Sequence, residues 1–248
     1  MINLAPEWFL REDILIGIFS LIVLGIFTIF AVKNYRINKN RNLLYLGLGF
    51  GLIALAQLGL ILTKAVIYYN TPVTTSIGVT IIESGVISSV DVLYGLSFFF
   101  YRMFTLLGFY VIYRLPQEKK FVGSDLALVT FFILVSAFIS SELFYIFHLT
   151  ALLLLILIVN SYYQVYKKNK FINTKILLVA FSMLALAQLL FVLSSFEVLF
   201  VVGSAIELIS YTILLGLIVR IMKHGKEKKP YGDNIRHVGN HSRKKRKH

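Results

Sequence analysis

Long apolar runs separated by short polar connectors form the main pattern along this chain. Crossing the hydrocarbon of a bilayer takes about 20 apolar residues in a helix, and seven stretches approach or reach that length. They cover residues 14–32, 43–62, 92–112, 126–139, 143–163, 176–193 and 198–221, and the fourth is the shortest. Because backbone groups in a membrane core must be hydrogen-bonded within the protein, and no period-two alternation suggests a barrel, these stretches are predicted to be helices.

Composition indicates the same class. Of 248 residues, 58% are hydrophobic and only 15% are charged, and the mean hydropathy is +0.79. So few polar groups cannot cover a soluble globule, and the chain is predicted to be an all-α, multi-pass protein of the cell membrane. We expect a seven-helix transmembrane domain over residues 1–221, followed by a basic, disordered cytoplasmic tail over residues 222–248.

The two sets of connectors differ in charge. One set holds Glu83, Asp91, Glu142 and Glu197, with Lys64 as its single loop cation. The other set holds Lys33, Arg36, Lys39, Arg41, Arg114, Lys119, Lys120, Lys167, Lys168, Lys170 and Lys175, and the tail continues from Arg220. Because short loops rich in Lys and Arg stay in the cytoplasm, the sequence predicts an amino terminus outside the cell and a carboxyl terminus inside.

Two parts of the chain resemble each other at one common offset. Residues 35–39 (YRINK) resemble residues 166–170 (YKKNK), residues 54–58 and 185–189 both read ALAQL, and Phe50 falls opposite Phe181. After a shift, residues 88–93 (SSVDVL) resemble residues 194–199 (SSFEVL). The sequence therefore predicts two parallel three-helix repeats joined by a linking fourth helix, an arrangement in which transporters place substrate sites between the halves.

The connector before the third span is the only sizeable one on the acidic side. It covers residues 65–87, and its Thr, Val, Ile and Gly content is compatible with a short hairpin or a helix lying on the membrane. Ser88 with Asp91, and Ser194 with Glu197, are predicted to form Ser-x-x-acid caps that open the third and seventh spans.

Two ionisable residues stand in the middle of predicted spans. Arg102 and Glu207 lie at similar distances from the predicted caps, and therefore at nearly the same depth. Because a lone charge at the bilayer centre is costly, we predict an ion pair that joins the two halves, with a functional and a purely structural role both open. The other polar candidates, expected to line a small cavity or to join helices, are Tyr101, Ser210, Tyr211, Gln57 and Gln188.

The tail carries many cations and almost nothing apolar. Its basic residues include Lys228, Lys229, Arg243, Lys244, Lys245, Arg246 and Lys247. This composition predicts disorder, and contact with anionic lipids of the inner leaflet is the favoured role. A cytoplasmic protein partner is the second alternative, and nucleic acid is a less favoured third.

The sequence contains no catalytic or metal-binding motif, so we predict a non-enzymatic protein without a cofactor or metal. The predicted arrangement resembles seven-helix receptors and the sugar-transporting SWEET proteins in helix count, orientation and duplication. It departs from them because all prolines lie outside the spans and the seventh span has no lysine to hold retinal. The favoured function is a sensor, receptor or assembly module of unknown ligand, and the alternative is a small-solute or ion transporter working at the repeat interface.

Overall fold

The computed structural model describes residues 7–39, 41–70, 83–117, 123–140, 143–193 and 197–227. Within these ranges every regular element is helical, which confirms the predicted all-α class. The α-helices are α1 (Leu10–Asn38), α2 (Arg41–Asn70), α3 (Glu83–Arg114), α4 (Gly123–Ile139), α5 (Phe144–Asn169), α6 (Ile172–Val192) and α7 (Glu197–Glu227). Short 3₁₀ turns precede α1 at Glu7–Phe9 and follow α3 at Leu115–Gln117.

Six of the described helices contain stretches long and apolar enough to cross a membrane, namely all except α4, whose apolar part is shorter. α1, for example, has 29 residues, which corresponds to about 43 Å at 1.5 Å per residue. A bilayer is about 30 Å thick in its hydrocarbon and about 40–45 Å with its headgroups. A helix of this length reaches through both headgroup layers, so the structure supports a multi-pass membrane protein.

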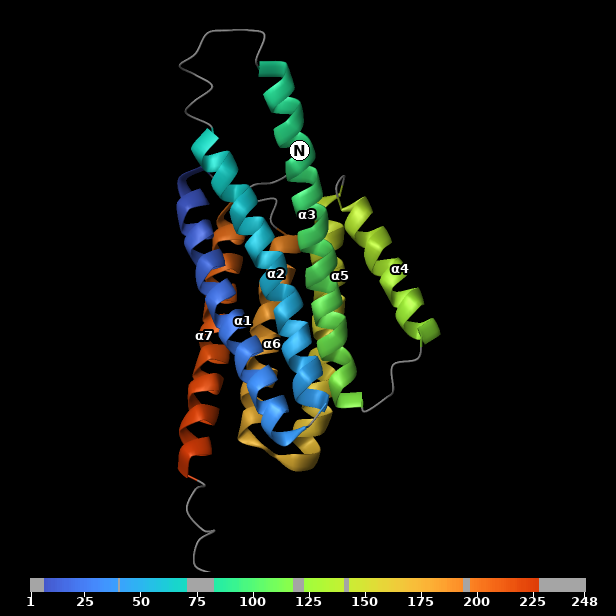
Figure 1. Cartoon of the computed structure of the whole chain (residues 1–248), viewed down its shortest axis with the longest axis vertical. Helices are drawn as coiled ribbons and strands as arrows, with labels where there is room; N and C mark the ends of the chain where they lie inside the picture. The colour runs from blue at the N-terminus through green and yellow to red at the C-terminus, as the bar shows by residue number, and fades with distance from the viewer. Residues whose placement is uncertain are drawn as a thin grey trace, which may run out of the picture.

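The contacts between neighbouring helices form a closed ring in the order α1, α2, α3, α5, α6 and α7. α4 lies to one side of this ring (Figure 1). We call α1, α2 and α3 one half of the ring and α5, α6 and α7 the other. In each half the middle helix packs along both neighbours, α2 against α1 and α3, and α6 against α5 and α7. The two halves join where α3 packs on α5 and where α7 packs on α1. α4 packs on α3 and α5, and its Phe131, Phe132 and Phe138 stay exposed.

Charge separates the two ends of the bundle. α1, α3, α5 and α7 run in the same direction, so their carboxyl ends lie together at the bottom of Figure 1. We call this the basic end, because Arg36, Arg114 and Lys167 lie in the last turns of α1, α3 and α5. The opposite end is the acidic end, with Asp13 and Glu197 in the first turns of α1 and α7.

The connector predicted over residues 65–87 is shorter than expected, because helices enter it from both sides. α2 continues to Asn70 and α3 begins at Glu83. Lys64 therefore lies inside α2 rather than in a loop, and Ser88 lies in the second turn of α3, so its predicted capping role is wrong. The physical reason is that a helix, once nucleated, continues at little cost beyond the apolar stretch that the hydropathy pattern marks. Residues 71–82 and the other predicted cap, Ser194, lie outside the described ranges.

α1 and α5 end in the same conformation. Lys39 and Lys170 both adopt a left-handed backbone, with φ of 53° and 52°. Their N–H groups donate to the carbonyl oxygens of Tyr35 and Tyr166 at 2.8 and 2.7 Å. The residue in this position is usually glycine, so a lysine at both helix ends is an uncommon feature that the two halves share.

α2 crosses both of its neighbours at glycines. A β-carbon added to Gly47 would lie 3.1 Å from the Cβ of Ala31 on α1, as expected for a small-residue contact between membrane helices. A β-carbon added to Gly108 of α3 would lie 2.5 Å from Ile53 Cγ1 and 2.7 Å from the carbonyl oxygen of Gly49, both on α2. The backbones of α2 and α3 therefore nearly touch at this crossing.

Replacing Gly108 by alanine is expected to destabilise the protein by about 1–3 kcal/mol, because the new methyl group meets a backbone that cannot move without separating α2 from α3. Gly216→Ala in α7 is the matched control, since a β-carbon there would have nothing within 4 Å and alanine is the better helix former. Thermal unfolding in detergent should show a lower midpoint for Gly108→Ala only. Equal midpoints for the two variants would contradict the close crossing.

Candidate ligand-binding site

A cavity lies between the ring helices in the half of the bundle next to the acidic end. Its volume is about 80 Å³, whereas one water molecule needs about 10–15 Å³ of such space. All six ring helices contribute to its wall. The polar side chains in the wall are Asp13 and Ser20 from α1, Gln57 and Lys64 from α2, Tyr101 from α3, His148 from α5, and Ser204 and Glu207 from α7. The space suits several waters or one small polar molecule at the junction of the two halves.

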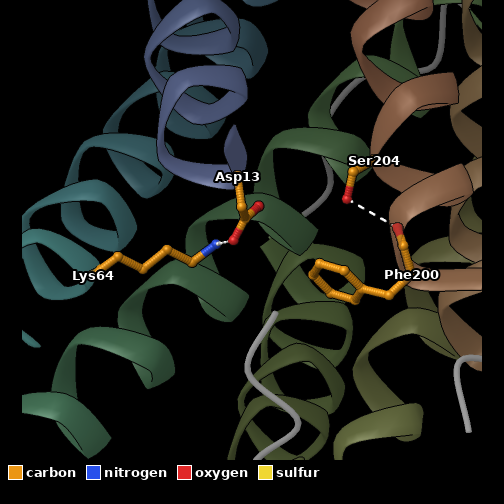
Figure 2. Close-up of polar contacts among 4 residues, drawn as sticks. All are labelled: Asp13, Lys64, Phe200 and Ser204. Carbon is orange, nitrogen blue, oxygen red and sulfur yellow. Dashed lines mark hydrogen bonds and ion pairs between the residues drawn. The ribbon is translucent and has the colours of Figure 1, made fainter. Parts of the chain in front are cut away.

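Asp13 and Lys64 join α1 to α2 at the acidic-end side of this cavity. The Lys64 Nζ group donates to Asp13 Oδ2 (Figure 2). Only 12% of the Lys64 side chain and 11% of the Asp13 side chain are exposed. Because both charges are largely removed from water, each needs the other as its counter-ion.

Two residues of α7, Phe200 and Ser204, line the same cavity. The Phe200 ring extends from α7 toward the side of the cavity where Asp13 and Lys64 meet (Figure 2). Ser204, one turn further along α7, donates its hydroxyl hydrogen to the Phe200 carbonyl oxygen at 3.0 Å. The cavity wall near the acidic end therefore combines an ion pair with an aromatic ring.

Glu207 lies deeper than the ion pair. It follows Glu197, the first residue of α7, by ten positions, which corresponds to about 15 Å along the helix. Its Oε1 atom accepts a hydrogen bond from the Tyr211 hydroxyl at 3.1 Å, and Tyr211 is buried. Gln57 and Tyr101 line the cavity together with Glu207. The structure thus brings three of the sequence-predicted polar residues to one cavity wall and places Tyr211 one turn below.

His148 and Gln188 join α5 to α6 beside the cavity. His148 Nδ1 lies 2.7 Å from Gln188 Oε1. An amide oxygen only accepts hydrogen bonds, so Nδ1 carries the hydrogen, and Nε2 of a neutral imidazole keeps a lone pair. The Nε2 atom is buried and has no hydrogen-bond partner among the described residues. Gln188 therefore acts through His148, whose ring orientation it fixes at the cavity wall.

Aromatic rings form a continuous strip along one side of the cavity. The centroid of the His148 ring lies 4.5 Å from that of Phe144 and 5.1 Å from that of Phe191. The Phe191 and Phe200 centroids are 5.3 Å apart. All four residues line the cavity, so a ligand there would contact aromatic faces and edges as well as polar atoms.

Stacked aromatic rings close the bundle between the cavity and the basic end. Phe50 of α2 and Phe181 of α6 stack across the two halves, with ring centroids 6.3 Å apart and ring planes 8° from parallel. Phe27 and Tyr162 pack on them at centroid distances of 4.2 and 5.6 Å. All four rings are buried, so side chains fill the middle of the bundle at this depth.

The structure places the other predicted site residues away from the cavity wall. Arg102 is buried, and its guanidinium carbon lies 5.7 Å from the centroid of the Phe98 ring. Ser210 donates to the carbonyl oxygen of Ala180 at 2.8 Å and so ties α7 to α6. The basic tail residues from Lys228 onward lie outside the described ranges.

The predicted Arg102–Glu207 ion pair stays a prediction. If the two charges stabilise each other, Arg102→Met and Glu207→Gln should each lower the thermal midpoint, and the double variant should recover at least half of the summed loss. The control is Glu197→Gln, which changes an exposed carboxylate on α7. A double variant that loses the full sum of the two single effects would contradict the pair.

Asp13, Lys64 and His148 line the cavity but are not among the site residues predicted from the sequence, which indicates a loop cation at Lys64 and a hydrogen-bonded residue near the outer end of its span at His148. A signal for the first two was present, because Asp13 opens the first span and Lys64 closes the second, at the same end of a helical hairpin. Opposite charges at matching depth on adjacent spans favour pairing. No comparable signal marks His148, because its partner Gln188 lies 40 positions away.

Comparison with protein-family models, with curated proteins and with solved structures finds no match to this chain. Within the ranges that the structure describes, no three His, Cys, Asp or Glu side chains gather where they could hold a metal ion. The function must therefore be argued from the cavity and the bundle around it.

Proposed function

We propose that this chain is a membrane receptor or sensor that binds a small molecule in the cavity and responds at the basic end without catalysing a reaction. The observation that carries this proposal is the position of the cavity, which touches all six ring helices and ends above the Phe50–Phe181 stack. A ligand there contacts both halves at once. Its binding free energy can therefore favour one relative arrangement of the halves over another.

The proposed orientation places the acidic end outside the cell and the basic end in the cytoplasm, with α4 as a seventh crossing. Lys and Arg residues in the last turns of α1, α3 and α5 support it, because such residues stay on the cytoplasmic side of membranes. The alternation of helix directions in Figure 1 is consistent with seven crossings. In this orientation the cavity lies on the outer side, where a receptor meets its ligand.

The proposal includes a duplication of three helices, with α1, α2 and α3 equivalent to α5, α6 and α7. The left-handed Lys39 and Lys170 support it, since they fall at the same offset as Phe50 and Phe181. The order of neighbours in the ring agrees as well, because α3 packs on α5 as α7 packs on α1. The stacking of Phe50 on Phe181 would then join equivalent residues near the axis that relates the halves.

The basic tail gives the proposed receptor a contact on the cytoplasmic side. Its cations, which include Lys228, Lys229 and the run from Arg243 to Lys247, suit anionic inner-leaflet lipids or an acidic surface on a cytoplasmic protein. Removing residues after Met222 is therefore expected to abolish the response while leaving ligand binding intact.

A transporter is the second candidate, because the cavity lies between two halves, as substrate sites do in duplicated transporters. Transport requires the cavity to open toward each side of the membrane in turn. Here that would require the halves to separate across the buried Phe50–Phe181 stack. A receptor needs no such opening, and for this reason we favour it.

Access to a cavity residue from the two sides separates these functions. The chain contains no cysteine, so Ser204→Cys introduces a single thiol into the cavity wall. A membrane-impermeant maleimide is applied to vesicles from either side, with Glu197→Cys and Asn169→Cys as exposed reporters of the acidic and basic ends. The receptor proposal expects Ser204→Cys to react from the same side as Glu197→Cys and never from the other. Reaction from both sides would instead establish alternating access.

The same reagent tests the seven crossings. Arg36→Cys and Asn169→Cys, at the ends of α1 and α5, are both exposed. Between them the chain passes through α2, α3, α4 and α5, so the number of membrane crossings is even only if α4 crosses. They are therefore expected to react from one side, opposite to Glu197→Cys. Reaction of Arg36→Cys and Asn169→Cys from opposite sides would remove α4 from the crossings.

A further inference from the structure

The donors in the cavity wall near the acidic end are already engaged by the protein. Ser20 and Ser204 each donate their hydroxyl hydrogen to a carbonyl oxygen of the preceding turn, at 2.7 and 3.0 Å. Lys64 is the one cation among the described lining residues, and it donates to Asp13. A ligand that brings only acceptors would therefore meet a cation whose charge Asp13 already balances.

Two acceptors of the wall residues have hydrogen-bonding capacity that the protein leaves unused. The Glu207 carboxylate has about four lone-pair positions and accepts the Tyr211 hydroxyl at one oxygen. His148 is 6% exposed, its Nδ1 is held by Gln188, and its buried Nε2 has no partner among the described residues. Leaving a buried acceptor unsatisfied is unfavourable, so the site is suited to a ligand that brings hydrogen-bond donors.

The charge of the wall selects the same kind of ligand. Among the side chains that line the cavity, Lys64 is paired with Asp13, and Glu207 is the carboxylate without a counter-ion in the lining; Arg102 is buried on α3 and does not line the cavity. Gln57 and Tyr101 add only neutral groups that can donate or accept. The aromatic strip of Phe144, His148, Phe191 and Phe200 borders this charge, and aromatic faces attract cations.

The geometry points to a small alkylammonium ion as the ligand of this cavity, with Glu207 as its counter-ion and His148 Nε2 as a neutral acceptor. The alkyl part lies against the aromatic strip. A volume of about 80 Å³ accommodates about five to eight non-hydrogen atoms, taking the 10–15 Å³ of one water for each. An ion of the size of n-butylammonium fits this limit.

This inference rests on the proposed function for the biological role of the site, but binding is measured separately from it. One-sided access to Ser204→Cys without ammonium binding would preserve the receptor and reject the ligand class. Ammonium binding with access from both sides would preserve the ligand class and reject the receptor.

Calorimetric titration of the full chain in nanodiscs of neutral lipid tests the ligand class. The probes are n-butylammonium, 1-butanol, butyrate and β-alanine, each at the same ionic strength. We expect n-butylammonium to bind and the other three to bind at least tenfold more weakly. Equal binding of 1-butanol would show that charge plays no part, and preferential binding of butyrate or β-alanine would assign the site to Lys64. Each of these results, and an absence of n-butylammonium binding, overturns the inference.

Two variants assign the contacts. Glu207→Gln keeps the shape of the side chain and removes its charge, and it should weaken n-butylammonium binding by about tenfold or more, because hydrogen bonds to charged groups are the stronger ones. His148→Phe keeps a ring and removes Nε2, and a several-fold loss is expected. Glu197→Gln, an exposed carboxylate on the same helix, should leave affinity unchanged. Equal losses for Glu207→Gln and Glu197→Gln would place the cation elsewhere.

A second measurement covers the case in which Glu207→Gln does not fold. n-Butylammonium should slow the maleimide reaction of Ser204→Cys in the cavity and leave the reaction of Glu197→Cys unchanged. Slowing of both reactions, or of neither, contradicts binding in the cavity.

Discussion

Lys64→Met is expected to lower the free energy of unfolding by about 3–5 kcal/mol, the range found when one partner of a buried ion pair is removed. The reason is that Asp13 would lose its counter-ion in a setting where only 11% of its side chain is exposed. Met preserves most of the length and apolar contact of the lysine side chain, so the loss reports on charge. Reversible unfolding of the purified protein in mixed micelles gives the measurement.

The double variant Asp13→Asn/Lys64→Met separates pairing from desolvation. It should recover most of the loss, because neither side chain then carries a charge, and neutral replacements of buried pairs are often close to neutral in stability. Lys175→Met, at an exposed position of α6, should change the free energy by no more than about 0.5 kcal/mol. A loss for Lys64→Met as small as that for Lys175→Met would mean that water or lipid headgroups already solvate Asp13.

Phe181→Ala is expected to have the next largest effect, a loss of about 3 kcal/mol, at the lower end of the range for buried Phe→Ala changes. Phe181 is fully buried and contacts both Phe50 and Tyr162. In a membrane the transfer of apolar surface between lipid and protein contributes little. The loss comes instead from the dispersion contacts of the deleted ring, because the side chains around the resulting cavity have no partner atoms to replace it.

Phe132→Ala is the matched control for this change. Phe132 is 60% exposed on α4, where lipid chains can refill the space of a deleted ring, so a change near zero is expected. A cycle with Phe50→Ala should give a coupling of about 0.5–1.5 kcal/mol between the stacked rings. Strictly additive losses at Phe50 and Phe181 would contradict a direct contact between the halves.

The stack also bears on mechanism, because it is the contact that a transporter would have to open. Phe50 and Phe181 belong to the middle helices of the two halves, and both are shielded by further rings. If Phe181→Ala allowed Ser204→Cys to react from the basic side, the stack would be the barrier between cavity and cytoplasm. An unchanged, one-sided reaction would show that other buried side chains also close the bundle.

The sequence by itself determined the helical class, the approximate position of each span and the separation of charge between the two ends. These properties are local, because the length of an apolar run and the sign of the flanking charges can be read without knowing any neighbour. The outer limits of the helices were less well determined. Asn70 and Glu83 lie beyond the apolar runs, where helical hydrogen bonding continues without a hydrophobic signal.

Only the tertiary structure decided which face of each helix points inward. In α2, Leu48 is 51% exposed and Phe50 only 1%, yet both are apolar, and in a membrane an apolar side chain is equally suited to lipid and to core. The pairing of His148 with Gln188, and the meeting of Asp13, Lys64 and Glu207 in one cavity, depend on helix rotation and on the order of helices in the ring. Hydrophobicity specifies neither, because both are set by the close packing of side chains from helices that lie far apart in the sequence.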